Sequence, residues 1–157
     1  SEVGQMLIII LMLIGGSPGS TAGGMKTTTL AVLVSSALSV FRKKEHTHFF
    51  GRRIPDDTIK NAATIFLMYI VLFLVGGMVI SSAEDIPLMT ALFETASAIG
   101  TVGLSLGITP DLGLVSHIIL ICLMFLGRVG GLTLIFATLS EKKLNGSKYP
   151  QEKITVG

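Results

Sequence analysis

The chain has 157 residues, of which 50% are hydrophobic and 14% are charged, and its formal net charge is +2. Its mean hydropathy is +0.74. These values exclude an ordinary soluble domain, whose core needs a charged surface around it. We expect an all-α membrane protein that has the lipid bilayer as its surface and no nucleic-acid partner.

The first apolar segment, residues 6–41, is interrupted by a block rich in Gly, Ser and Thr at residues 15–29. Several Gly and a Pro cannot hold a regular helix, because each Gly costs about 1 kcal/mol and Pro about 3 kcal/mol relative to Ala. We therefore expect a broken membrane helix. Unwound backbone at membrane depth must border water or protein, so the block is expected to lie in a pore. The alternative is a small-residue surface on which helices pack closely.

The block ends in Lys-Thr, as the phosphate loop of nucleotide-binding proteins does. That motif requires Lys directly after its last Gly, whereas Met25 stands between Gly24 and Lys26. We therefore expect this chain to bind no nucleotide and no other cofactor. Lys26 lies near the end of a half-helix, and the bland interpretation is that it extends toward the membrane surface.

Two further apolar segments follow a basic connection at residues 42–60. Residues 61–81 contain no charge, and as a helix they would span about 31 Å, which matches one bilayer crossing. Residues 112–140 form a second crossing, with Arg128 near its middle. A charge at that depth is costly and normally faces a partner or an aqueous path.

Between these crossings lies a segment, residues 85–99, that is too short to cross and is followed by glycines. A helix that enters the membrane and returns fits it best. The next residues, 100–105, contain a TVG tripeptide, and potassium filters use backbone carbonyls of a TVG-type sequence to replace the hydration shell of the ion. An ordinary loop turn is the alternative. The residues predicted to bind the cation through their carbonyls are Gly100, Thr101, Val102 and Gly103.

The basic residues indicate the orientation. Apart from Lys26 and Arg128, they all fall in residues 42–60 and in the tail, residues 141–157, whereas the connection holding the short helix has only acidic charges. The positive-inside rule then places both basic segments in the cytoplasm and the filter loop outside. Glu94, on the short helix, either adds to the negative field at the filter or is structural.

Four segments resemble the Trk/Ktr/HKT superfamily of potassium transporters, and most closely the membrane subunit of bacterial Ktr potassium uptake systems. They are GGSPGSTAGGMKTTT (15–29), SAIGTVGLSLGIT (97–109), FLGRVGGLTL (125–134) and YPQEKITVG (149–157). The resemblance implies four repeats of helix, re-entrant helix and helix around one pore. It implies that residues 1–41 are the second helix of the third repeat, and residues 61–140 the complete fourth repeat. We therefore expect a C-terminal fragment that lacks the remainder of its own pore.

The resemblance also implies a gate and partners. The family's loop-contacting arginine matches Arg128, and we expect Arg128 and Lys26 to lie against the gating loop. Family members form homodimers on a cytoplasmic ring that carries the regulatory nucleotide, with residues 42–53 and the lower half of the broken helix as the expected contacts. Leu104 replaces the Tyr of potassium channels, so weaker potassium selectivity is expected. The gating loop comprises Gly15, Gly16, Ser17, Pro18, Gly19, Ser20, Thr21, Ala22, Gly23 and Gly24.

The sequence thus predicts uptake of potassium or another monovalent cation, gated by an intramembrane loop and regulated by a nucleotide-binding subunit. We expect no enzyme, because the sequence has no Ser/His/Asp set, paired carboxylates or metal-ligand spacing. The alternative is a broken-helix secondary transporter of another small ion or solute. Glycine carbonyls and outward acidic residues favour the cation.

Overall fold

The computed structural model describes residues 2–43, 47–49 and 52–129. This part is mostly helical, with α1 (Glu2–Leu13), α2 (Thr27–Phe41), α3 (Asp56–Glu84), α4 (Leu88–Gly100), the short 3-10 turn η1 (Thr109–Asp111) and α5 (Leu114–Val129). A small antiparallel hairpin joins β1 (His48–Phe49) to β2 (Arg52–Arg53), with His48 opposite Arg53. The sequence analysis did not predict this hairpin, which lies within the basic connection.

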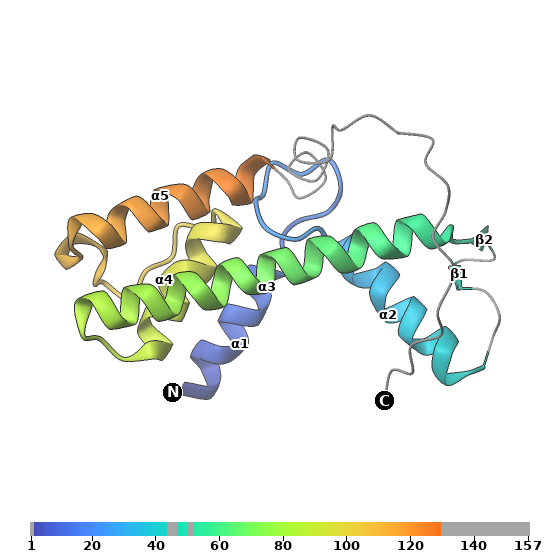
Figure 1. The fold of residues 1–157 in the computed structure, drawn as a ribbon, viewed down its shortest axis with the longest axis horizontal. Helices are drawn as coiled ribbons and strands as arrows, with labels where there is room; N and C mark the ends of the chain where they lie inside the picture. Colours follow the sequence, from blue (N-terminus) through green and yellow to red (C-terminus); the bar gives the residue numbers. More distant parts are fainter. Residues whose placement is uncertain (1, 44–46, 50–51, 130–157) are drawn as a thin grey trace, which may run out of the picture.

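The helices are arranged around α3, which runs along the middle of the molecule (Figure 1). α2 packs against its N-terminal half, and α4 and α5 pack against its C-terminal half. α4 contacts α1, α3 and α5 and is the most enclosed helix, because every residue from Phe93 to Gly100 is buried. The buried core accordingly draws on all four of these helices, with Ile9, Met12, Tyr69, Phe73, Ile80, Phe93, Ile99, Leu120 and Leu123 among its members.

α3 is the one described helix that is long and apolar enough to cross a membrane by length and composition. The predicted crossing, residues 61–81, lies within α3, which extends beyond it at both ends. The predicted crossing was limited to a charge-free segment, but charges at a membrane surface do not stop a helix. Its bounds are instead set by Pro55, which precedes the first turn, and by Asp85, whose left-handed φ of 51° ends the helix.

The short helix was expected over residues 85–99, and α4 begins later, at Leu88, directly after Pro87. Asp85 terminates α3 and Pro87 fixes an extended entry, so helical structure resumes only after the proline. The second crossing was expected over residues 112–140. α5 begins at Leu114, and residues 130–140 and the tail lie outside the described residues.

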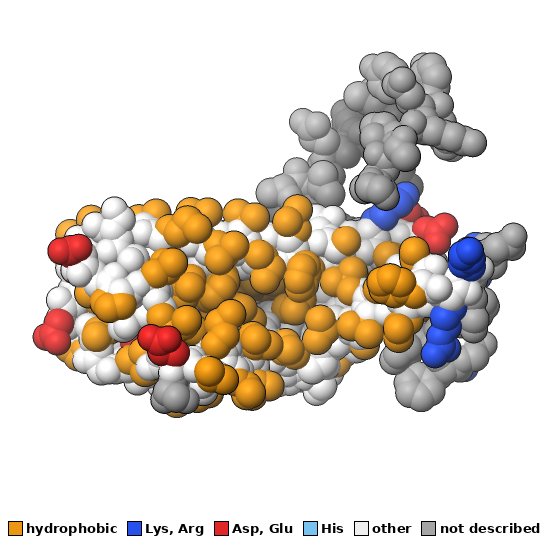
Figure 2. Space-filling view, turned by 90° about the horizontal axis from the view of Figure 1, so that it is seen from below, with side chains coloured by type: hydrophobic (Ala, Val, Ile, Leu, Met, Phe, Trp, Pro, Cys, Tyr) orange, Lys and Arg blue, Asp and Glu red, His pale blue; other side chains and the backbone are white. Residues whose placement is uncertain are grey.

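The surface is apolar along much of its length. Figure 2 shows hydrophobic side chains gathered along the middle, while the Lys and Arg side chains visible in this view lie toward one end. Leu7, Leu67 and Ile121, on three different helices, are 57%, 62% and 62% exposed. An apolar surface of this extent fits the expected surroundings of lipid and neighbouring protein.

Candidate functional site

The predicted filter begins at a strained cap of α4. The N–H of Thr101 donates to the carbonyl of Ala98 at 3.1 Å, and the N–H of Val102 donates to that of Ser97 at 3.0 Å. These two bonds form a Schellman motif, in which glycine usually takes the left-handed position. Here Thr101 takes it, with φ of 51° and ψ of 40°. A β-branched residue in this conformation costs about 1–3 kcal/mol and persists only where its surroundings hold it.

The chain then leaves α4 as an irregular segment on the surface of the described part, residues 102–106, which we call the filter strand although it is not a β-strand. Val102 and Leu104 are 45% and 49% exposed. Gly103 has a φ of +81°, and a Cβ placed on it would meet nothing within 4 Å. Beside this strand, α4 and α5 line an open cavity of about 350 Å³. The predicted cation ligands therefore lie at an open face of the chain.

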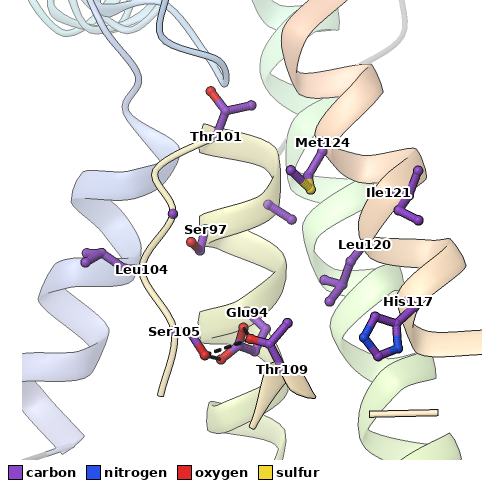
Figure 3. A pocket seen from close by; sticks show the side chains of 12 residues that line it. Glu94, Ser97, Thr101, Leu104, Ser105, Thr109, His117, Leu120, Ile121 and Met124 are labelled. Carbon is purple, nitrogen blue, oxygen red and sulfur yellow. Dashed lines mark hydrogen bonds between the residues drawn. The ribbon is translucent and has the colours of Figure 1, made fainter. Parts of the chain in front are cut away.

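A hydrogen-bonded cluster lies at the opposite end of that cavity. Glu94 is 4% exposed, and its carboxylate accepts hydrogen bonds from the Ser105 hydroxyl, the Leu106 N–H and the Thr109 hydroxyl. Figure 3 shows Glu94, Ser105 and Thr109 together, with Thr101 at the other end of α4. The sequence analysis named Glu94 but did not identify its partners, because a Ser and a Thr in an irregular segment have no periodic signal.

The glycine-rich block is an ordered loop between two separate helices. α1 ends at Leu13 and α2 begins at Thr27, and the close packing that was the alternative is also present, because a Cβ on Gly23 would lie 2.9 Å from the carbonyl oxygen of Ile99. The N–H of Gly15 donates to the carbonyl of Met25 at 2.7 Å, which closes the base of the loop. At its tip, Pro18 and Gly19 occupy the central positions of a turn in which φ of Gly19 is +88°.

Two positively charged side chains bind the backbone carbonyls of this loop. Arg128 Nη1 donates to the carbonyl of Thr21 at 2.7 Å. Lys26 Nζ donates to the carbonyls of Ser20 at 3.1 Å and Ala22 at 2.8 Å. The structure thus brings Arg128, Lys26 and the loop together. The Lys26 ammonium is directed to two carbonyls of the loop and not away from it.

The loop also contacts the start of the filter. The N–H of Gly23 donates to Thr101 Oγ1 at 2.9 Å, and the N–H of Gly24 donates to the Gly127 carbonyl at 3.2 Å. The backbones approach so closely here that a Cβ on Gly127 would lie 2.0 Å from the carbonyl oxygen of Ile99. The sequence analysis missed this junction, for which the glycines at all three elements were the only signal.

Among the described residues, no group of three or more His, Cys, Asp and Glu is placed to hold a metal ion. The predicted ligands of a transported cation are of a different kind, the backbone carbonyls of residues 100–103. Carbonyl oxygens suit a weakly hydrated monovalent cation, which gives up its water shell to them.

Comparison of the amino-acid sequence with known proteins assigns the chain to a family. A family model for TrkH, described as a cation transport protein, matches residues 1–147. The chain is 42% identical over 134 residues to the potassium/sodium uptake protein NtpJ of Enterococcus hirae, which covers 82% of this chain and 30% of that protein. It is 35% identical over 126 residues to the Ktr system potassium uptake protein B of Bacillus subtilis, with coverage of 80% and 28%.

The Ktr system potassium uptake protein B of Vibrio alginolyticus is 32% identical over 134 residues, with coverage of 81% of this chain and 28% of the relative. The chain therefore spans less than a third of the length of these relatives. The family model, by contrast, matches nearly the whole chain. The chain belongs to the TrkH family of cation transport proteins and is part of an all-α membrane protein.

Proposed function

We propose that the full protein takes up potassium through a carbonyl filter, of which this chain supplies one quarter, and that residues 15–24 gate the pore below it. The observation that carries the proposal is the junction at the end of α4, where the filter start, the loop and α5 meet. The names of the relatives, potassium and potassium/sodium uptake proteins, support a monovalent cation as the substrate.

The filter proposal rests on three properties of the strand after α4. The C-terminal end of α4 points its partial negative charge toward this strand, which favours a cation. Gly103 has a backbone conformation that most residues avoid, and its open side is free for the other repeats of the pore. Thr101 holds the start of the strand in a fixed geometry. These properties suit carbonyls that must be aimed at an ion.

The gate proposal rests on charge as well as shape. The carbonyls of Ser20, Thr21 and Ala22 are occupied by Lys26 and Arg128, so they are not free to bind a passing cation. Two positive charges beside the loop also repel a cation that approaches it. The loop therefore opposes potassium both sterically and electrostatically until these contacts are exchanged.

The full protein is proposed to work as a homodimer on a cytoplasmic nucleotide-binding ring. The Ktr system name of the relatives supports a separate regulatory subunit. The basic residues 42–53 and the hairpin within them, where Arg52 and Arg53 are exposed, form the proposed docking surface. This chain needs no cofactor of its own in such an arrangement.

The filter is tested by comparing Gly103→Ser with Gly19→Ser in the full-length protein. Both glycines have left-handed φ angles, +81° and +88°, and a Cβ on either would meet nothing within 4 Å. Each substitution therefore imposes strain without a clash. Gly103→Ser should lower the ratio of potassium to sodium uptake in proteoliposomes, whereas Gly19→Ser should change the flux and leave the ratio unchanged. An unaltered ratio in Gly103→Ser would contradict the filter.

The secondary-transporter alternative has a different signature in the same proteoliposomes. An anionic solute that competes with, or is required for, cation uptake would support it. Potassium flux that depends only on the potassium gradient and the membrane potential supports the channel-like filter. Wild-type protein that takes up no potassium in either condition refutes the proposed function.

A further inference from the structure

We propose that Glu94 is a positioning residue for the filter: it holds the chain segment that leaves the filter and so sets the discrimination between potassium and sodium. This inference deepens the proposed function and rests on it. Glu94 lies on α4 two turns before Thr101 and is 4% exposed. A buried carboxylate is stable only where hydrogen-bond donors replace its water.

All of the donors that hold this carboxylate come from the segment after the filter. Ser105 Oγ and the Leu106 N–H donate to Oε1 at 2.7 and 2.9 Å, and Thr109 Oγ1 donates to Oε2 at 2.8 Å. Glu94 therefore ties residues 105–109 to the same helix that positions Thr101. The filter strand is held at both ends by one rigid element, with its start at the helix cap and its exit at Glu94 (Figure 3).

The strand between these two anchors has little else to hold it. Residues 102–106 form no helix or strand, and Leu104 and Leu106 are 49% and 38% exposed. Two glycines with left-handed φ, Gly103 and Gly107, flank Ser105 and Leu106, two of the three tethered residues. Glycine is the most flexible residue in the backbone, so a segment between two glycines adapts easily unless a side chain restrains it. Glu94 supplies that restraint.

Restraint matters for selectivity because a filter discriminates by the spacing and field of its carbonyls. A strand that adapts freely can close around the smaller sodium ion, whereas a strand held at both ends cannot. The same contacts argue against a role through charge alone, because each oxygen of the carboxylate is used by a neighbouring donor. We therefore expect geometry, and not the negative charge, to be the property that matters.

Glutamine separates geometry from charge. In Glu94→Gln the amide oxygen keeps Ser105 and Leu106, and the amide NH₂ donates to Thr109. The Thr109 hydroxyl is then free to donate to Ser105, at the 2.8 Å contact that the two hydroxyls already make. Glu94→Gln thus preserves every contact without the charge. Glu94→Ala removes the contacts and the charge together and leaves the Leu106 N–H without its acceptor.

The test measures binding of potassium and sodium to purified full-length protein by calorimetry. We expect the ratio of the potassium affinity to the sodium affinity to fall at least tenfold in Glu94→Ala and to stay within about twofold of wild type in Glu94→Gln. A tenfold fall corresponds to a change of about 1.4 kcal/mol in the difference between the two binding free energies. Thr109→Val, which removes one donor and keeps the side-chain shape, should fall between them. It keeps the inference testable if Glu94→Ala fails to fold.

Hydrogen exchange gives a second readout that does not depend on ions. The Leu106 amide should exchange at least tenfold faster in Glu94→Ala and at the wild-type rate in Glu94→Gln. Equal loss of selectivity in Glu94→Gln and Glu94→Ala would assign the effect to charge and overturn the inference. So would an unchanged affinity ratio or unchanged exchange in Glu94→Ala. Potassium uptake in proteoliposomes reports separately on the proposed function, which can fail while selective binding and its dependence on Glu94 remain.

Discussion

Replacing Arg128 by Ala should favour opening of the gating loop. Its guanidinium joins the end of α5 to the carbonyl of Thr21 at 2.7 Å. A hydrogen bond to a charged group contributes about 1.5–3 kcal/mol. Because this contact is exposed to solvent, we take the lower end of that range. About 1.5 kcal/mol corresponds to a tenfold fall in the ratio of closed to open loop.

The assay is potassium flux through the full-length protein in proteoliposomes, with and without the cytoplasmic regulatory subunit. Flux without the subunit should rise about tenfold in Arg128→Ala, and the stimulation by the subunit should shrink by a similar factor. Arg128→Lys keeps the charge and loses the planar donor, so its flux should be intermediate. Lys60→Ala is the control, because it removes an exposed positive charge from α3 and leaves the Thr21 contact intact.

A correctly inserted and folded Arg128→Ala protein with unchanged flux and unchanged regulation would refute the gate. Deleting residues 19–23 is a less specific test of the same idea. The deletion also removes Gly23, whose N–H is bonded to Thr101 at the filter. Loss of flux in the deletion could therefore come from the filter, whereas Arg128→Ala changes the loop contact alone.

Three further predictions concern the junction and the docking surface. Thr101→Val removes the acceptor of the Gly23 N–H, and this hydrogen bond contributes about 0.5–1.5 kcal/mol. Flux without the regulatory subunit should therefore rise up to about tenfold, and Thr101→Ser, which keeps the hydroxyl, should return it to the wild-type value. Gly127→Ala places a Cβ 2.0 Å from the Ile99 carbonyl oxygen and should lower the thermal stability by more than Gly76→Ala. A Cβ on Gly76 meets side-chain atoms, not backbone, the nearest being the end of the Leu123 side chain at 2.9 Å. An equal loss of stability would contradict the close approach. Neutralising the basic segment should weaken binding of the cytoplasmic regulatory ring. The residues replaced together are Arg42, Lys43, Lys44, Arg52 and Arg53. Co-purification of the ring at wild-type yield would show that these residues are not its docking surface.

The sequence was sufficient for the features that depend on local composition. The break between α1 and α2 follows from the local cost of Gly and Pro, and α3 follows from a long charge-free segment. Helix ends were less accurate, because they depend on a proline at Pro55 or Pro87 and on the left-handed Asp85, not on the nearest charge. Local chemistry predicts elements well and their bounds less well.

The family resemblance predicted that Arg128 lies against the loop, but neither its acceptor nor the junction between the loop and the filter start was predicted. Gly23 and Thr101 are 78 positions apart, and Thr21 and Arg128 are 107 apart. Only the folded arrangement of α1, α4 and α5 brings them together. The direction of the Lys26 side chain depends in the same way on carbonyls that become available only once the loop has formed.

Thr101 belongs to both the filter and the gate junction, so the energies of its contacts determine whether gating disturbs selectivity. Its left-handed conformation costs about 1–3 kcal/mol, whereas the single bond from Gly23 contributes about 0.5–1.5 kcal/mol. The loop bond alone therefore does not hold Thr101 in place. The two cap bonds to Ala98 and Ser97, on a helix that is buried to its end, hold it instead. The loop can then leave while the filter start keeps its geometry, so Thr101→Val should raise flux without changing the ratio of potassium to sodium uptake. A changed ratio would mean that the loop helps to shape the filter.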